Sequence, residues 1–484
     1  MEQATTSTAG MYINGAWTGA RSGKRFVVRN PATLEPLAEV GDGGREETRA
    51  AIEAAHAAFP AWAGTPAPER AALLQRTARL ITEHRDALAV TLTQENGKPL
   101  AQARAEVDGM AELCVWFAEE ARRIAGRILP PDTPTRRILT LRQPVGVVAA
   151  ITPFNFPGNL LARKLAPALA AGCTVVVRPA RVTPLIAVSL FKILAGAGAP
   201  PGVANLVTGT DSAGMGEELA THPLVRKVTF TGSTDIGKGL LAKAAGTVKR
   251  VSMELGGHAP FLVFADADLD KAAAAAALSG FRNCGQVCTS TNRVLVQQQV
   301  AAAFTERLVA LTRPLRLGNG LEPGVEVGPL IDKAGFDKVV AHVEDARAKG
   351  ATVLVGGQPA KPDGLKGYFY EPTVLTGVNL DMRVMHEETF GPVLPVMAFE
   401  TEEEALRIAN DTPYGLAAYF FTRDVGRVFR VAERLEYGIV GANDPRPVGT
   451  HFPFGGMKES GLGRENGTEG IEAFLEVKSV VIGL

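Results

Sequence analysis

Apolar residues recur along this chain as short β-branched runs separated by longer stretches with helical spacing. The short runs predict strands at 145–151, 173–177, 205–207, 227–230 and 250–253. The stretches between them predict helices at 160–171, 185–197, 214–220 and 236–245. Continuous apolar strands that alternate with helices are typical of a buried parallel sheet built of βαβ units. The pattern therefore predicts an α/β fold.

The flanking regions have different patterns. Apolar spacing predicts helices at 45–63, 68–84 and 85–125, and a Pro-rich, Arg-bearing ribbon follows at 128–142. The last residues, 474–484, alternate in polarity, so we expect them to pair with this ribbon, in cis or in trans.

A second alternating set follows Glu254. It predicts strands at 261–264, 294–296, 352–355, 393–398 and 418–421, most of them separated by helices at 300–311, 336–349 and 402–410. This set predicts a second α/β domain.

Composition narrows the class of protein. The 484 residues suggest about two to four domains. Lys and Arg total 51, as do Asp and Glu, so no nucleic-acid or anionic-membrane partner is expected. The longest apolar stretch, around 272–278, is too short for a bilayer, and Met1 to Gly10 lacks the features of a secretory signal. Four cysteines are too few for a disulfide scaffold, which favours a reducing cytoplasm.

The most informative segment is Phe281–Ser290, which contains Cys284 and Cys288. A thiol at Cys288 among small and amide-bearing residues is a candidate nucleophile. The CxxxC spacing would also suit a metal or a disulfide, but no His or second Cys pair lies nearby, so no metal site is predicted. Upstream, Glu254 follows a β-type run and precedes a Gly-Gly turn, where it could act as a base.

Two loops in the first βαβ series suit a nucleotide. Gly232 and Ser233 lie in a GSTxxG turn between a strand and a helix, which could present free N–H groups to a pyrophosphate. An ordinary helix capped by Ser233 explains the turn equally well. Arg178 and Arg181 follow another strand, where they could hold a ribose phosphate or simply be solvated.

Two further loops carry polar side chains after or before strands. Asn155, in Thr152–Pro157, could donate to an oxyanion or could cap a turn. Glu387 and Glu388 could be functional or could be exposed loop carboxylates.

Together these motifs resemble the aldehyde dehydrogenase superfamily over nearly the whole chain. The motifs that carry the resemblance, in order, are TPFNFP, FTGSTDIG, MELGGHAP, FRNCGQVC, EETFGP and PFGGMKESGLGRE. The resemblance implies that Cys288 is the nucleophile, Glu254 the general base, and Asn155 an oxyanion donor with the Cys288 N–H. It also implies a cofactor site for NADP or NAD, formed by Thr152, Phe154, Arg178, Pro179, Ala180, Arg181, Gly209, Gly232, Ser233, Leu255, Glu388 and Phe390.

Within the superfamily the chain most resembles succinate-semialdehyde dehydrogenases. Arg163 and Arg282 match arginines that grip a distal carboxylate, for which the planar guanidinium is suited. Both could instead pair with the protein's own carboxylates. Val448 is expected to contact substrate, and its loop, Asn443–Phe452, departs from the pattern of these enzymes because it contains Arg446 and His451.

The cofactor region also departs from its relatives. NAD-preferring members often carry Glu where Arg181 stands, and that carboxylate repels a 2′-phosphate. Arg181 is therefore expected to favour NADP.

The resemblance implies a Rossmann-like parallel-sheet cofactor domain at 1–127 and 144–253, and a second α/β catalytic domain at 254–468. A small β oligomerisation element at 128–143 and 469–484 would form a homodimer or homotetramer. The alternatives are an aromatic or medium-chain aldehyde dehydrogenase and a non-catalytic paralogue.

Overall fold

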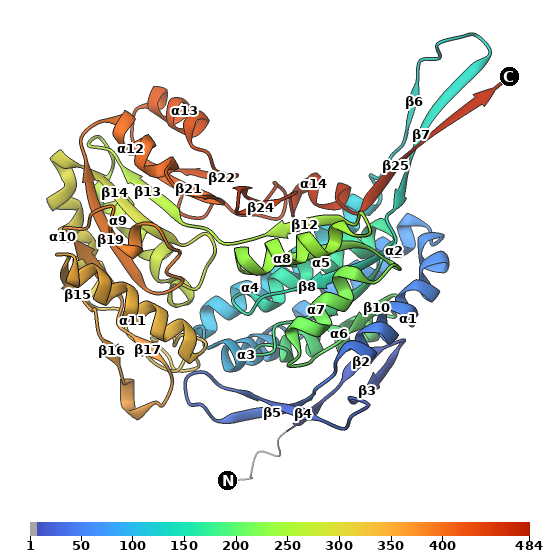
Figure 1. Ribbon diagram of the computed structural model, residues 1–484, viewed down its shortest axis with the longest axis horizontal. Coiled ribbons are helices and arrows are strands. Elements are labelled where there is room, and N and C mark those ends of the chain that lie inside the picture. The colour runs from blue at the N-terminus through green and yellow to red at the C-terminus, as the bar shows by residue number, and fades with distance from the viewer. Residues whose placement is uncertain (1–6) are drawn as a thin grey trace.

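The protein has two lobes and a projecting arm (Figure 1). This computed structural model describes residues 7–484. Residues 1–6, which belong to the N-terminal segment predicted to lack a secretory signal, lie outside the described residues. Among the residues that are described, no helix combines the length and apolarity needed to cross a bilayer.

The first lobe is built on an eight-stranded sheet in the order β24-β12-β11-β8-β9-β10-β2-β3. Its five central strands are parallel and buried, as the apolar runs predict. They are β8 (Val147–Ile151), β9 (Thr174–Arg178), β10 (Ala204–Leu206), β11 (Val225–Thr231) and β12 (Arg250–Glu254). The edges are antiparallel strands: β2 (Met11–Ile13), β3 (Ala16–Thr18) and β24 (Gly461–Leu462).

Helices pack on this sheet through extensive apolar clusters. They are α1 (Arg45–Ala63), α2 (Ala67–Glu83), α3 (Arg85–Asn96), α4 (Leu100–Ala121), α5 (Pro157–Ala171), α6 (Leu185–Gly196), α7 (Ser212–Thr221) and α8 (Thr234–Ala245). A small sheet of β1 (Ser7–Ala9), β5 (Pro36–Gly41) and β4 (Arg25–Arg29) lies near the N-terminus. The N-terminal strands were not predicted, because β1, β2 and β3 have only three residues each.

The predicted helix at 85–125 is two helices. The break falls at Gly97, which has a φ of 89° and ends α3 in the left-handed conformation. A Cβ atom there would also lie 2.8 Å from the ring of Pro329. Pro99 then starts α4, so Lys98 is held in a tight turn between the two helices.

The second lobe contains a seven-stranded sheet in the order β15-β18-β19-β14-β13-β21-β22. All neighbours are parallel except β15 with β18. The strands are β13 (Ala259–Val263), β14 (Thr291–Gln297), β15 (Thr352–Val355), β18 (Thr373–Thr376), β19 (Val393–Phe399), β21 (Ala417–Phe421) and β22 (Ile439–Ala442). The helices of the C-terminal half are α9 (Leu269–Phe281), α10 (Ala301–Thr312), α11 (Lys333–Ala348), α12 (Glu402–Asn410), α13 (Val425–Arg434) and α14 (Gly467–Glu472). The predicted second α/β unit is thus present.

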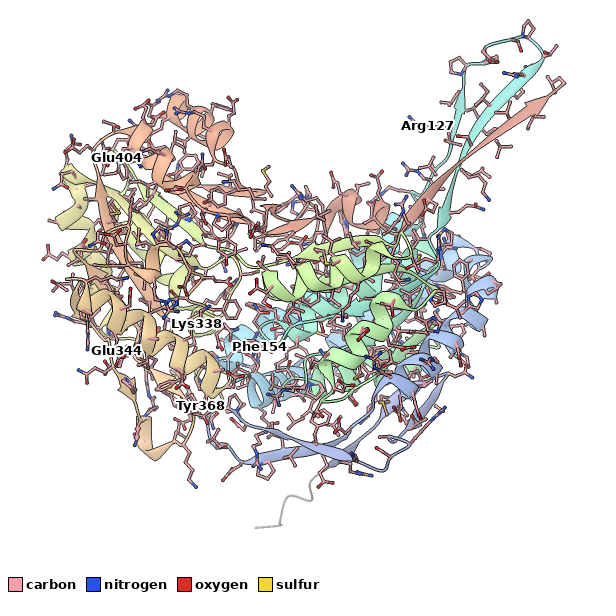
Figure 2. All side chains as sticks on the ribbon, in the orientation of Figure 1. Arg127, Phe154, Lys338, Glu344, Tyr368 and Glu404 are labelled. Atoms are coloured by element: carbon pink, nitrogen blue, oxygen red, sulfur yellow. The ribbon has the colours of Figure 1, made fainter. Side chains whose placement is uncertain are left out.

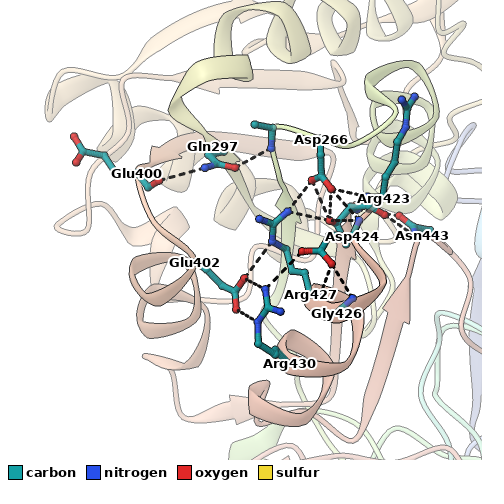
Figure 3. A network of polar contacts seen from close by, with 12 residues as sticks. Asp266, Gln297, Glu400, Glu402, Arg423, Asp424, Gly426, Arg427, Arg430 and Asn443 are labelled. Atoms are coloured by element: carbon teal, nitrogen blue, oxygen red, sulfur yellow. Dashed lines mark hydrogen bonds and ion pairs between the residues drawn. The ribbon is translucent and has the colours of Figure 1, made fainter.

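Side chains stabilise the outer edge of this lobe (Figure 3). The Asp266 carboxylate accepts bonds from the Thr422 hydroxyl, the backbone N–H groups of Arg423 and Asp424, and the Arg427 guanidinium. Arg427 also donates to Glu402 on α12. The network therefore ties α12 and α13 to the loop after β13.

The arm is a three-stranded antiparallel sheet of β6 (Arg127–Leu129), β7 (Arg136–Pro144) and β25 (Leu475–Gly483). The tail pairs with the ribbon of its own chain, from Leu475 opposite Pro144 to Gly483 opposite Arg136. Figure 1 shows the arm extending away from the first lobe, with the C-terminus at its tip.

Candidate active site

The order of strands in the first sheet creates a place for a ligand. From the central β8 the chain first runs outward to β9 and β10, then returns to the other side of β8 to form β11 and β12. The connections after β8 and β11 therefore diverge to opposite faces, which opens a crevice at the carboxyl ends of these strands.

Buried polar atoms without partners gather at these strand ends. Within residues 7–484, no hydrogen-bond partner is found for the Thr152 hydroxyl after β8, the Arg178 Nε that ends β9, or the Thr231 hydroxyl that ends β11. A buried polar atom without a partner lowers the stability of the fold unless a ligand or water forms a hydrogen bond with it. Their position at the switch in strand order fits a dinucleotide.

The two arginines after β9 differ in their environments. Arg178 is buried, and its guanidinium contacts the Ser212 hydroxyl, so it is not merely a solvated surface group. Burial lowers its pKa. Arg181 is exposed, two residues beyond Pro179 and Ala180.

The GSTxxG turn connects β11 to α8, across the crevice from the two arginines. Gly232 donates its N–H to the Glu254 carbonyl at 3.0 Å. Ser233 occupies the N-cap position of α8, but its side chain makes no capping bond. The ordinary capping role therefore does not explain this serine.

Neighbouring loops close around the turn. Leu255 is buried, and a Cβ atom on Gly237 of α8 would lie 2.3 Å from its side chain. Gly209, after β10, approaches the Gly43 carbonyl so closely that a Cβ atom would lie 2.1 Å from that oxygen.

Residues from the second lobe face this crevice. The Glu388 carboxylate accepts the N–H of Gly257 at 3.1 Å, and burial raises the pKa of Glu388 to about 7. Phe390 has a φ of 53° and packs edge-on against Phe154, with ring centroids 5.9 Å apart. Figure 2 places Phe154 between the two lobes.

Glu387 has a different role. It is exposed and pairs with Arg383 and His342. Of the two adjacent carboxylates, only Glu388 therefore turns into the interior.

Cys288 lies in the loop that leads into β14, between the lobes. A Cβ atom on Gly257 would come within 2.3 Å of the Cys288 carbonyl, so this loop packs directly on the turn after β12. The pKa of the Cys288 thiol is raised to about 12, mainly by burial and also by Glu388 and Glu254, although Arg163 and Arg282 act to lower it. Cys284 is fully buried and also free.

Glu254 ends β12 and is almost wholly buried. Neither carboxylate oxygen has a partner among the described residues. Burial raises its pKa well above the usual range, and the nearby Glu465 adds to this effect, while Lys164 opposes it. A carboxyl group whose pKa is raised in this way is a stronger base, when ionised, than an ordinary surface carboxylate.

Asn155 lies in the loop between β8 and α5. Its side-chain Oδ1 is buried and has no partner in the described chain, so Asn155 does not act as a turn cap. The carbonyl of Asn155, in contrast, accepts two hydrogen bonds, from Lys98 and Asn283.

Arg163 and Arg282 have no carboxylate partner in the described part of the chain. Across residues 7–484 neither forms an ion pair or a side-chain hydrogen bond. The guanidinium of Arg163 lies over Phe454, 4.3 Å from the ring centroid, and that of Arg282 lies 5.2 Å from the centroid of Phe156. The alternative that they pair with the protein's own carboxylates is therefore wrong for the described residues.

A pocket adjoins Cys288 on the side of Arg282. Its lining includes Val287 and Thr289, the neighbours of Cys288, together with Tyr419, Arg446 and Val448. His451 lies elsewhere, against Trp116 and Phe452.

Three buried charged residues near the site were not found from the sequence. Lys164 pairs with Glu465 at 2.5 Å, and Lys98 contacts the loop of Asn155. Two signals in the sequence could have indicated them. Lys98 precedes a proline, and Lys164 lies within an apolar helix.

In the part of the chain that the structure describes, no cluster of His, Cys, Asp and Glu could hold a metal ion.

Comparison with known proteins identifies the family of this chain. Residues 17–480 match the aldehyde dehydrogenase family. The chain is 50% identical to the 3-sulfolactaldehyde dehydrogenase of Pseudomonas putida, over 98% of this chain and 96% of that protein. It is 49% identical to the NADP-dependent succinate-semialdehyde dehydrogenase of Escherichia coli, over 98% and 97% respectively.

The fold also matches a solved structure. The crystal structure of succinate-semialdehyde dehydrogenase from Burkholderia pseudomallei superposes with a TM-score of 0.97, at 48% identity over the whole of both chains.

Proposed function

This chain belongs to the aldehyde dehydrogenase family, and we propose that it oxidises a short semialdehyde with a terminal carboxylate, such as succinate semialdehyde. The product is the carboxylic acid, and NAD(P)⁺ is reduced. The names of the two curated relatives specify aldehydes with an acidic group, a sulfonate or a carboxylate. The observation that carries the proposal is the pair Arg163 and Arg282, which both lie near enough to Cys288 to lower the pKa of its thiol and which have no carboxylate partner among the described residues.

The first step forms a bond between Cys288 and the aldehyde carbon. The thiolate attacks, and the carbonyl electrons move onto the oxygen. The side-chain amide of Asn155 and the Cys288 N–H would donate to this oxyanion, which is the largest single source of stabilisation in such steps. Arg163 and Arg282 favour the thiolate, because both lower the thiol pKa.

The adduct then loses a hydride, and the carbonyl re-forms as a thioester on Cys288. The nicotinamide, when bound, supplies the acceptor for this hydride. The unpaired atoms of Thr152 and Arg178, with Ser233 and Glu388, would hold the cofactor. Arg181 favours NADP, because its exposed guanidinium can pair with a 2′-phosphate.

Glu254 completes the cycle. Its carboxylate takes a proton from water, the resulting hydroxide attacks the thioester carbon, and the carbon–sulfur bond breaks to return the thiolate. The absence of a partner for either Glu254 oxygen, among the described residues, leaves both free to contact water.

The test compares Arg282→Ala with the unaltered enzyme on two aldehydes of equal length, one with a terminal carboxylate and one neutral. A hydrogen-bonded charge pair is worth about 1.5–3 kcal/mol, so KM for the carboxylated aldehyde should rise by about one to two decades, and KM for the neutral one far less. Equal effects on both would make the arginine structural and would favour an aromatic or medium-chain aldehyde.

A further inference from the structure

The side chain of Asn155 is not anchored by its own hydrogen bonds. Its Oδ1 has no partner among residues 7–484, although the side chain is buried. An oxyanion donor has to be placed to within a fraction of an ångström, because a displacement of about 1 Å can cost a hundredfold in rate. The orientation of this amide must therefore come from the backbone that carries it.

That backbone is held by donors on both sides of the residue. The Asn155 carbonyl accepts the Lys98 ammonium at 2.7 Å and the Asn283 side-chain amide at 3.0 Å. The preceding carbonyl, of Phe154, accepts the side-chain amide of Asn96 at 2.8 Å. The two peptide units that set the direction of the Asn155 side chain are thus both fixed.

Lys98 is itself fixed by charge and by packing. Its side chain is fully buried, and its ammonium lies 2.5 Å from the Glu106 carboxylate and 3.9 Å from the ring centroid of Phe156. Glu106 also accepts the N–H groups of Gly158 and Asn159, in the first turn of α5. The same ion pair therefore fixes the loop of Asn155 and the helix that follows it.

Asn283 connects this loop to the nucleophile. It lies five residues before Cys288 and has a φ of 49°, in the left-handed region. Its backbone N–H donates to Gln102 of α4 while its side chain holds the Asn155 carbonyl. The segment that carries Cys288 and the loop that carries Asn155 are thus joined through one side chain.

We propose that Lys98 and Asn283 are positioning residues that hold the Asn155 amide in register with the Cys288 sulfur. Neither needs to touch the substrate. The proposal rests on the proposed function, because it takes Asn155 as the oxyanion donor. It predicts that the two residues act on the rate of acylation through Asn155.

The experiment is a double-mutant cycle on the full-length enzyme, read as the rate of the first turnover of reduced cofactor. Lys98→Met is combined with Glu106→Gln, so that the double variant has no unpaired buried carboxylate. The amide oxygen of the new glutamine can still accept the N–H groups of Gly158 and Asn159. Glu106→Gln alone, which retains the ammonium but removes its counter-charge, measures how much of the effect comes from the loss of the ion pair. Lys249→Met is a second control, since Lys249 also holds two backbone carbonyls, those of His222 and Val225, but lies at the opposite end of β12.

We expect the Lys98 double variant to slow acylation by about tenfold to a hundredfold, with cofactor affinity and KM unchanged. Lys249→Met should acylate normally, and Glu106→Gln alone should slow acylation less than the double variant does. In an Asn155→Ala background the same pair of substitutions should have no further effect. Multiplicative losses in that background, or normal acylation in the double variant, would overturn the proposal.

Asn283→Gly keeps the inference testable if the Lys98 variant does not fold. Glycine accepts the left-handed backbone of Asn283, so the substitution removes only the side chain. It should slow acylation in the unaltered enzyme and not in Asn155→Ala. If Asn155→Ala itself acylates normally, the oxyanion role in the proposed function is wrong; if only the coupling is absent, the positioning role alone is wrong.

Discussion

The thiol of Cys288 is surrounded by groups that act on it in opposite directions. Burial, Glu388 and Glu254 favour the protonated thiol, and Arg163 and Arg282 favour the thiolate. Binding of an anionic aldehyde at the arginines would reduce their help, so the chemistry depends on how the two arginines share their charge between substrate and sulfur.

Replacement of Cys288 by Ala should abolish aldehyde oxidation and leave cofactor affinity intact, since the thiol bonds to substrate and not to the dinucleotide. Steady-state turnover and fluorescence titration with NADP measure the two effects. Cys284→Ala serves as the control and should keep its activity, because Cys284 is buried away from solvent. Turnover like that of the unaltered enzyme in Cys288→Ala would end the proposed mechanism.

Glu254→Gln should show a rapid burst of reduced cofactor followed by slow turnover, because acylation survives and thioester hydrolysis does not. The pKa of Glu254 is raised, so the active carboxylate is lost as pH falls through that raised value. Hydrolysis in the unaltered enzyme should therefore slow toward low pH, and the variant should lose this dependence. Stopped-flow measurement across a pH series checks both results; a missing burst would place Glu254 in thiol activation.

Arg181→Glu should weaken NADP binding by about one to two decades and leave NAD nearly unchanged, because only the 2′-phosphate meets this exposed side chain. Dissociation constants for both cofactors give the answer. An equal loss for the two would show that the substitution disturbs the loop after β9 rather than a phosphate contact.

The candidate catalytic residues were easier to propose from the sequence than the buried residues that contact them. Cys288 and Glu254 stand in segments whose small and polar residues differ from the apolar runs around them. Lys98 and Glu465 are polar residues among other polar residues, and nothing local marks them as buried. Lys98 contacts Asn155, which is 57 positions away, and Glu465 contacts Lys164, which is 301 positions away. Only the fold brings these residues together.

Among the elements, the central βαβ series was predicted to within a few residues. The strands β8 and β9 are buried throughout and read as nearly continuous apolar runs, whereas β11 and β12 also contain polar residues. The break between α3 and α4 was missed because the apolar spacing continues across Gly97, and only the proline that follows signals a new helix. The short N-terminal strands leave too few residues for alternation to be recognised.

The network around Asp266 offers a test at the scale of elements. Asp266→Asn removes the charge that organises the connection between β21 and α13, and it should lower the free energy of unfolding by about 1 kcal/mol after allowance for solvent screening. The pKa of Asp266 is depressed, so its contribution is present above the unfolded-state value and is lost as pH falls. The denaturation midpoints of the unaltered protein and Asp266→Asn should therefore differ at neutral pH and become equal at acidic pH.

Asp337→Asn is the matched control for this test. Asp337 forms an exposed pair with Lys333 one turn away on α11, and solvent screens such a pair strongly. A midpoint shift as large as that of Asp266→Asn would show that any surface carboxylate matters equally, contrary to the role given to the network.

At the scale of the whole molecule, the arm is the feature that a single chain leaves incomplete. It carries exposed apolar side chains at Ile128, Val477 and Val481, and its outer strands have unpaired edges within the described chain. Exposed strand edges are ready to pair with another chain. We expect at least a dimer, built through this arm.

Sedimentation at micromolar concentration measures the assembly. Val481→Lys places a charge on the exposed face of β25 and should weaken the association. Val248→Lys, at a more exposed site outside the arm, should not weaken it if the arm is the main contact. A monomer in the unaltered protein would contradict the prediction.

The last strand of the first sheet, β24, comes from residues 461–462, and the partner of Lys164 is Glu465. During synthesis, the first lobe therefore emerges from the ribosome with one strand missing and a lysine in its interior without its counter-charge. Glu254 likewise lacks its neighbour Glu465 until then. A nascent chain can collapse around the central strands early. The region around Glu254 and Lys164, however, becomes enclosed only after residues 461–465 have been synthesised.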